Sequence, residues 1–170
     1  MSMTTHARGT FDATMTPQPP DDNAADVPVG RMPLAKQFHG DLDATSAGQM
    51  LAVSTDVDGS ARYVALERVT GTLQGRGGSF ALQHNGTMTR GTPYLTVTVV
   101  PDSGAAHLVG LAGALTIAIV DGQHVYDFAY TLLCLEEPLC TVLQSSLALG
   151  GTIPRLAPVG HHLSLGVFCS

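Results

Sequence analysis

The sequence predicts an all-β protein, and three observations support this prediction. Glycine is frequent, at 19 of 170 residues, whereas charged residues make up only 13% of the chain and aromatic residues only 5%. Short runs of alternating apolar and polar residues recur between Gly-rich turns, and the Asp121-Gly122 pair is typical of a two-residue hairpin turn. Strands spaced by about 8 to 12 residues are typical of a β-sandwich or a closed β-barrel.

We assign the expected strands from alternation and from the turn residues between them. A Pro-, Asp- and Ala-rich loop follows the first strand, and Gly40 is expected to bend the second. The strands are predicted at residues 10–15, 32–44, 49–54, 63–73, 79–88, 94–100, 106–111, 114–120 and 124–131.

Two hairpins can be given a register from their turns. Around Asp121-Gly122, Ile119 is expected opposite His124, so that Ile117 faces Tyr126 on an apolar face. In the hairpin formed by residues 63–73 and 79–88, we expect the glycines of residues 75–78 in the turn. Leu73 is then paired with Phe80, and Val69 with His84.

Glu67 and His84 fall on the same apolar face of this second hairpin, as diagonal neighbours. A buried carboxylate without a partner costs several kcal/mol, and an imidazole would supply that partner. The pair could fix the strand register, orient a ligand or act as an acid/base pair. A register slip by one residue would instead place Glu67 beside Gln83 and Asn85. We select Glu67 and His84 as candidate catalytic residues.

Four further residues are candidates for ligand binding. Tyr63 and Tyr126 could place hydroxyl groups in an interior cavity, although buried tyrosines are more often core residues with a satisfied hydroxyl. His39 and Gln83 complete the set. Asp41 and Asp43 share the alternation of His39, and because burying two acids is expensive we expect both at the surface.

The chain resembles a bacterial family of domains of unknown function, the family numbered 3224. The resemblance rests on FHGDLDATSAGQML (residues 38–51), YVALERVTGTLQGRGGSFALQHNGTM (63–88), VVPDSGAAHLVGLAGALTI (99–117) and YDFAYTL (126–132). That family is similar to the allene oxide cyclase-like β-barrels, which implies a closed antiparallel barrel of eight strands with a small lumen. Some relatives of this barrel type are cyclases, but none of their catalytic residues matches a motif in this chain.

The resemblance divides the chain into a barrel domain at residues 7–132 and an irregular C-terminal extension at residues 133–170. The extension is rich in Leu, Gly and Pro, and a short helix at residues 140–149 is one alternative for it. Its residues Cys134, Cys140, His161 and His162 match no standard zinc spacing, so no metal site is predicted.

Composition excludes several classes of function. The formal net charge of −6 disfavours nucleic acid as a partner, and no segment is apolar for long enough to span a membrane. No phosphate-binding loop, dinucleotide fingerprint or nucleophile elbow occurs, so no cofactor is expected. Because no secretory signal is visible, we expect a cytoplasmic protein; a homo-oligomer is left open.

We therefore predict a small barrel that binds a small apolar molecule in its lumen. The alternative is a cofactor-independent cyclase or isomerase that acts on an unsaturated lipid-like or polyketide-like substrate. A structural scaffold is a third reading, which predicts a filled barrel and a sizeable exposed apolar patch.

Overall fold

The structure is a computed structural model that describes residues 3–19 and 29–132. The predicted C-terminal extension at residues 133–170, with its cysteines and its helix alternative, lies outside the described residues. The described part consists of strands and their connections, and no helix in it is long and apolar enough to cross a membrane.

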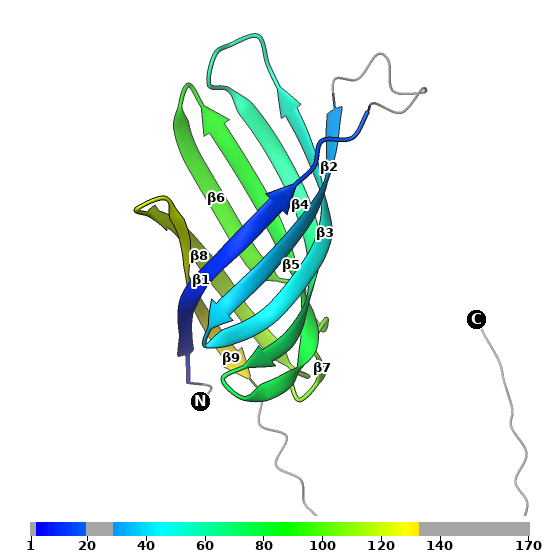
Figure 1. The fold of residues 1–170 in the computed structure, drawn as a ribbon, viewed down its shortest axis with the longest axis vertical. Coiled ribbons are helices and arrows are strands. Elements are labelled where there is room, and N and C mark those ends of the chain that lie inside the picture. Colours follow the sequence, from blue (N-terminus) through cyan, green and yellow to red (C-terminus); the bar gives the residue numbers. More distant parts are fainter. Residues whose placement is uncertain (1–2, 20–28, 133–170) are drawn as a thin grey trace, which may run out of the picture. The chain divides into compact units, whose positions relative to one another are not determined.

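Nine strands follow one another along the described residues (Figure 1). Their bounds are β1 (Thr5–Met15), β2 (Val29–Gly40), β3 (Leu42–Ser54), β4 (Ala61–Leu73), β5 (Arg76–Thr89), β6 (Thr92–Val99), β7 (Ala105–Ala106), β8 (Leu111–Val120) and β9 (Gln123–Leu132).

Eight of these strands close into an antiparallel barrel, which confirms the predicted fold class. The order around the wall is β4-β3-β2-β1-β9-β8-β6-β5, and pairing of β4 with β5 completes the circle. The very short β7 pairs with the start of β5. Because β1 pairs with both β2 and β9, the two ends of the barrel sequence meet in the wall.

The wall is weakest between β6 and β8. Most neighbouring strands pair over seven or more residues, but across this seam the described residues form a single pair, Thr98 with Ala114. Beyond that pair the two strands diverge, and β6 stays attached through β5 while β8 stays attached through β9 (Figure 1). We call this region the β6–β8 seam.

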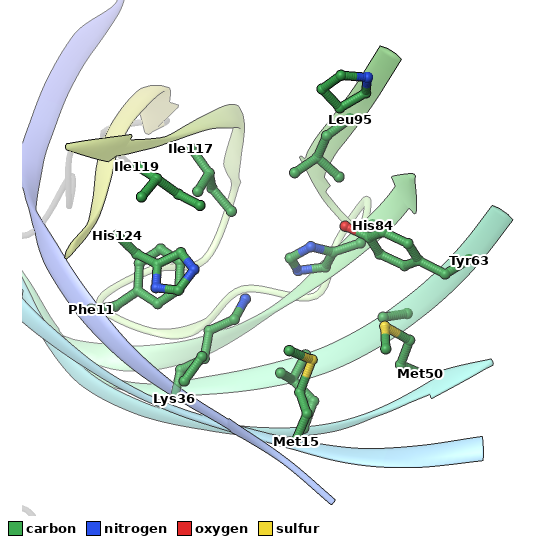
Figure 2. A pocket seen from close by; sticks show the side chains of 14 residues that line it. Phe11, Met15, Lys36, Met50, Tyr63, His84, Leu95, Ile117, Ile119 and His124 are labelled. Carbon is green, nitrogen blue, oxygen red and sulfur yellow. The ribbon is translucent and has the colours of Figure 1, made fainter. Parts of the chain in front are cut away.

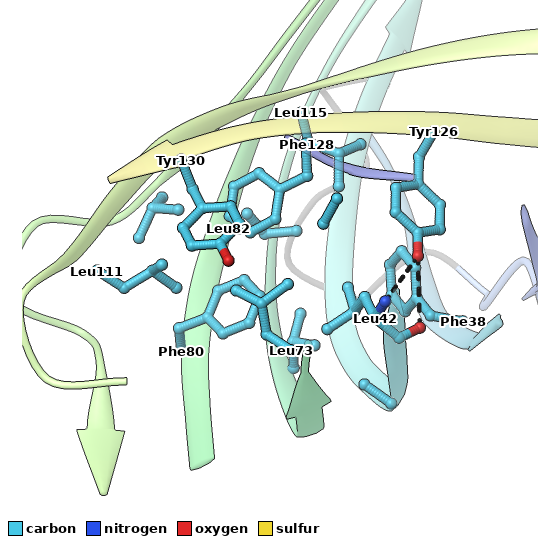
Figure 3. Close-up of a cluster of buried hydrophobic side chains, with 14 of the residues drawn as sticks. Phe38, Leu42, Leu73, Phe80, Leu82, Leu111, Leu115, Tyr126, Phe128 and Tyr130 are labelled. Carbon is cyan, nitrogen blue, oxygen red and sulfur yellow. Dashed lines mark hydrogen bonds between the residues drawn. The ribbon is translucent and has the colours of Figure 1, made fainter. Parts of the chain in front are cut away.

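One end of the barrel is filled by a hydrophobic core (Figure 3). The rings of Phe80 and Phe128 stack there with centroids 5.8 Å apart, and the Tyr130 ring lies tilted against Phe128 at 5.3 Å. Leu108, from the loop that follows β7, is buried against the same cluster. The core therefore closes the end that carries the β2–β3 and β4–β5 turns.

Three hairpins have a two-residue turn whose second residue is glycine. Gln74-Gly75, Arg90-Gly91 and Asp121-Gly122 all have positive φ at both residues. Such a pair is the type I′ turn, whose twist matches that of paired strands and which strongly favours Asn or Asp followed by Gly. The predicted register across Asp121-Gly122 is confirmed, with Ile119 opposite His124.

The predicted register of the other hairpin is wrong by four residues. The β4–β5 turn is Gln74-Gly75, so Leu73 pairs with Arg76 and Val69 pairs with Phe80. Gly77 and Gly78, which were expected in the turn, instead belong to strand β5. A shift by an even number leaves each side chain on its predicted face, because side chains alternate with a period of two.

Two predicted strands are also corrected. The segment 32–44 is not one bent strand, because Gly40 has a φ of 105° and the chain reverses at Asp41, so that β3 starts at Leu42. Of the strand predicted at residues 106–111, only Ala106 lies in β7, and Leu111 is the first residue of β8. Turns take over after Ala106, which itself has a positive φ.

Candidate functional site

The end of the barrel opposite the core holds a pocket of about 490 Å³ (Figure 2). This volume lies within the range of roughly 300 to 1,000 Å³ that small-molecule sites occupy. The pocket is lined by Phe11, Ala13, Met15, Leu34, Lys36, Met50, Tyr63, Ala65, His84, Pro93, Leu95, Ile117, Ile119 and His124. None of these side chains is acidic.

The pocket has a buried floor and an exposed rim. Phe11, Lys36 and His84 are buried, whereas Met15 and Ile119 at the rim are 52% and 70% exposed. Leu95 on β6 and Ile117 and Ile119 on β8 line the pocket from the two sides of the β6–β8 seam (Figure 2). The pocket therefore reaches the surface along apolar side chains.

A cluster of four polar side chains lies at and behind the floor, which we call the Glu67 cluster. Four adjacent strands supply one residue each: Lys36 from β2, Ser46 from β3, Glu67 from β4 and His84 from β5. Glu67 Oε1 accepts hydrogen bonds from Lys36 Nζ and from His84 Nε2, each at 2.7 Å, and Oε2 accepts one from Ser46 Oγ at 2.6 Å.

The Glu67 carboxylate is ionised and has both oxygens occupied. Burial by itself raises the pKa of this carboxyl group, but the hydrogen bond from His84, the charge and hydrogen bond of Lys36 and the hydrogen bond from Ser46 outweigh burial. Together they lower its pKa from 4.5 to about 2. Glu67 is fully buried and does not line the pocket, so it acts on a bound molecule only through its partners.

Of the Glu67 cluster, the groups that face the pocket are the Lys36 ammonium and the His84 ring. An ionised carboxylate only accepts hydrogen bonds, so His84 Nε2 carries the proton of their shared bond. In the neutral ring Nδ1 then holds a lone pair. Lys36 Nζ also lies 5.1 Å from the centroid of the Phe11 ring and 5.8 Å from that of Phe38, distances at which an aromatic face stabilises a cation.

The structure brings three of the predicted site residues together. The expected contact between Glu67 and His84 is confirmed, and they remain diagonal neighbours because His84 pairs with Ala65. Tyr63 lines the same pocket, and its ring lies over Gly86, where any Cβ atom would overlap it. Burial and the nearby charge of Glu67 raise the pKa of the Tyr63 hydroxyl, which keeps it protonated.

The other three predicted residues lie elsewhere. Tyr126 is buried in the core, where its hydroxyl accepts a hydrogen bond from the Leu42 amide at 2.9 Å (Figure 3). His39 is on the outer face of β2, about half exposed, and its ring contacts Asp12 at 3.1 Å. Gln83 is exposed on the outer face of β5. His39 and Gln83 thus do not line the pocket.

Three residues at the pocket or in the Glu67 cluster were not predicted from the sequence: Lys36, Ser46 and His124. Lys36 sits between Leu34 and Phe38 on the inner face of β2, and a lysine on an apolar face is itself a signal for a buried acid. Ser46 was not selected because the prediction joined the first residues of β3 to β2 in a single strand. His124 had been placed on an apolar face without a role, and its ring stacks on Phe11 with the centroids 4.8 Å apart.

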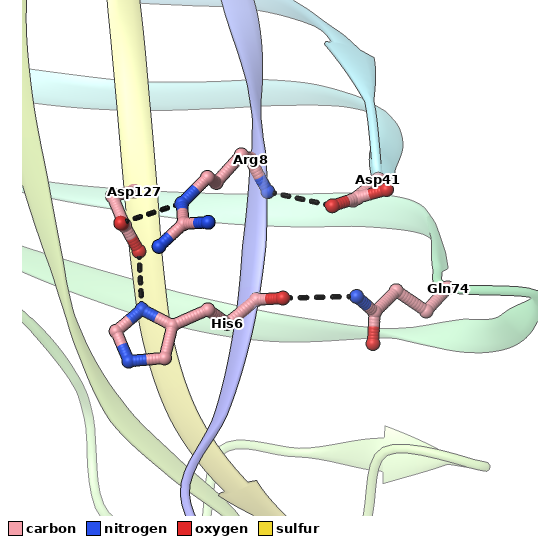
Figure 4. Close-up of polar contacts among 5 residues, drawn as sticks. All are labelled: His6, Arg8, Asp41, Gln74 and Asp127. Atoms are coloured by element: carbon pink, nitrogen blue, oxygen red, sulfur yellow. Dashed lines mark hydrogen bonds and ion pairs between the residues drawn. The ribbon is translucent and has the colours of Figure 1, made fainter.

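A second polar cluster, on the outside of the barrel, is separate from the pocket (Figure 4). Asp127 accepts hydrogen bonds from His6 Nδ1 at 2.6 Å and from Arg8 Nε at 2.8 Å, and these hydrogen bonds lower its pKa. Asp41 accepts from the Arg8 amide at 2.8 Å, and Asp41 and Asp43 are exposed as predicted. These contacts are exposed to solvent and join β1 to its neighbours.

In the described ranges no three His, Cys, Asp or Glu side chains are grouped so that they could hold a metal ion. The Glu67 cluster contains only two such residues, Glu67 and His84, and these two are hydrogen-bonded to each other. The donors at the floor therefore favour recognition by hydrogen bonds and charge.

Comparisons with known proteins agree with this architecture. A family described as "Protein of unknown function (DUF3224)" matches residues 7–130. The chain is similar to a protein of unknown function of this family from Shewanella oneidensis, whose crystal structure is known, with 47% identity and a TM-score of 0.72. The match covers 77% of this chain and 98% of that one. A search of the curated proteins found no match. The chain therefore belongs to the DUF3224 family.

Proposed function

We propose that the protein binds a small, largely apolar molecule in the pocket at the open end of its barrel. The observation that carries this proposal is a pocket of about 490 Å³ whose floor holds two polar groups, Lys36 and His84. Its walls are mostly apolar, and Tyr63 and His124 are the other polar residues that line it. Apolar walls with a few fixed polar groups are the usual composition of small-molecule sites. The scaffold is closed and the floor is held by the Glu67 cluster, which favours a preformed site.

Binding of a neutral apolar fluorophore, N-phenyl-1-naphthylamine, tests this proposal. Ala13 lines the pocket, so Ala13→Phe fills part of it, and we expect at least about tenfold weaker binding of the fluorophore. Ala35 is exposed on the outer face of β2, so Ala35→Phe adds the same group outside and serves as the matched control. Equal binding by both variants, or no binding by the unmodified protein, would contradict the proposal.

A cofactor-independent cyclase or isomerase is the second candidate, and the orientation of His84 favours it. The ring is held through Nε2 by an ionised carboxylate, which leaves the Nδ1 lone pair to take a proton from a bound substrate and return it at another carbon. Conversion of 4-decen-2-one to its conjugated isomer is one suitable assay. A rate that is the same in the unmodified protein and in the His84→Gln variant would remove His84 from such a mechanism.

Two broader predictions also remain proposals. A relationship to the allene oxide cyclase-like barrels is supported by the closed eight-stranded architecture. A homo-oligomer is supported by an apolar patch on the outer face of β3 and β4, formed by Leu51, Val64 and Leu66, which are 44%, 48% and 59% exposed.

A further inference from the structure

The polar floor of the pocket presents a positive charge to the pocket and no negative charge. The acid of the Glu67 cluster is buried behind the floor, and its two oxygens accept hydrogen bonds from Lys36, His84 and Ser46. The cation of the cluster, Lys36, reaches the pocket itself (Figure 2). The pair of charges therefore presents its positive end to the pocket, where no acidic side chain lies among the lining residues.

Lys36 has hydrogen-bond donors that the described residues do not use. An ammonium group has three donors, and of the described residues only Glu67 accepts a hydrogen bond from Lys36 Nζ. The aromatic rings of Phe11 and Phe38 stabilise the charge but accept no conventional hydrogen bond. The remaining donors of Nζ are therefore free to meet an oxygen atom of a molecule in the pocket.

His84 lies beside Lys36, since both nitrogens bond the same oxygen of Glu67 at 2.7 Å. Its Nδ1 accepts a hydrogen bond when the ring is neutral and donates one when the ring is protonated. A carboxyl group suits both states, because it can donate from its hydroxyl or accept as a carboxylate. Its two oxygens can also provide one acceptor for Lys36 and one for His84, whereas a hydroxyl group has a single oxygen.

The rest of the pocket suits an apolar chain. From the floor to the rim it is lined by Leu34, Met50, Leu95, Ile117 and Ile119, and flexible Met side chains adapt to irregular apolar surfaces. A molecule with one polar end and an apolar body would thus place its polar end on the buried floor and its body along these side chains.

We propose that the ligand of this pocket is an amphipathic carboxylic acid whose carboxyl group binds Lys36 Nζ and His84 Nδ1. This inference rests on the proposed function, because it names the chemical class that the same pocket selects. Lys36 and His84 contact the carboxyl group, and Glu67 is a positioning residue that holds both of them.

The test compares decanoate with decan-1-ol, which has the same chain and a neutral end, by displacement of bound N-phenyl-1-naphthylamine. We expect decanoate to bind at least about tenfold more tightly, because hydrogen bonds between charged groups are stronger than neutral ones. In Lys36→Met this preference is lost while the fluorophore still binds. Arg62→Met, which removes a cation from the exposed face of β4, keeps the preference and is the matched control.

Lys36→Met leaves the buried Glu67 carboxylate without its cation, which can destabilise the protein. The double variant Lys36→Met/Glu67→Gln therefore provides a second form in which no buried charge lacks a partner. Equal affinity for decanoate and decan-1-ol, or a preference that persists in both Lys36 variants, would overturn the inference while binding of the fluorophore upholds the proposed function. If the fluorophore does not bind the unmodified protein, the proposed function itself fails.

Discussion

At the scale of single residues, the unusual feature is an ionised glutamate inside an apolar barrel. Removing a carboxylate from water costs several kcal/mol unless other groups replace its hydration. Three hydrogen bonds from Lys36, His84 and Ser46 provide that replacement for Glu67. Each donor comes from a different strand, so the acid also ties together the part of the wall that supports the pocket.

The Glu67 cluster predicts a specific loss of stability in acid. The pKa of Glu67 is about 2 in the folded protein against 4.5 for an unperturbed group. Because the folded value is the lower one, the stabilisation is complete above pH 4.5 and is lost as the pH falls toward 2. The difference corresponds to about 3 kcal/mol in the free energy of unfolding.

Urea unfolding at several pH values measures this loss, with Glu67→Gln as the reference that cannot titrate at this position. We expect the stability difference between the two proteins to shrink as the pH is lowered through this window. Parallel pH profiles for the two proteins would show that Glu67 is not held as the structure indicates.

The sequence predicted the contact of Glu67 with His84 but not its full environment. Alternation alone placed both residues on one face of the sheet. This placement stayed correct although the predicted register was wrong by four residues. The roles of Lys36 and Ser46 depend on the pairing of β2 with β3 and of β3 with β4, which are contacts across different hairpins. Local patterns carry little information about such pairings, which are set by the closure of the whole barrel.

At the scale of elements, the tight turns decide the registers. Asp121-Gly122 was predicted because Asp tolerates positive φ, whereas Gln74-Gly75 and Arg90-Gly91 adopt the same turn with residues that tolerate it less well. The glycines at residues 77 and 78 were the more conspicuous turn signal, and they misled the prediction of the β4–β5 register. Gly78 lies within the strand against Ala105 and Leu108, which leave no room for a side chain there.

This comparison predicts that Arg90→Asn stabilises the protein. The φ of Arg90 is 47°, and Asn adopts this conformation at lower cost than Arg, so we expect a gain of about 0.5 kcal/mol. Thermal unfolding measures the effect. Asp121→Arg, which introduces the less suitable residue at the corresponding position of the β8–β9 turn, is expected to destabilise by a similar amount. A loss of stability in Arg90→Asn would contradict this account of the turns.

At the scale of the whole molecule, the barrel is divided into a filled end and an open end. The aromatic core closes one end, and the pocket occupies the other, where the β6–β8 seam is held by a single strand pair. Strand edges that lack a partner open more readily than fully paired ones. Leu95 on β6 and Ile119 on β8 both line the pocket, so the pocket lies directly against this seam.

The central claim is that a small molecule binds inside the open end of the barrel. Methyl resonances of the protein titrated with decanoate test it most directly. The account predicts saturable shifts for the methyl groups of Met50, Ile117 and Ile119, which line the pocket, and none for Leu51 and Leu66 on the outer face. Shifts confined to Leu51 and Leu66, with the pocket methyl groups unchanged, would contradict it.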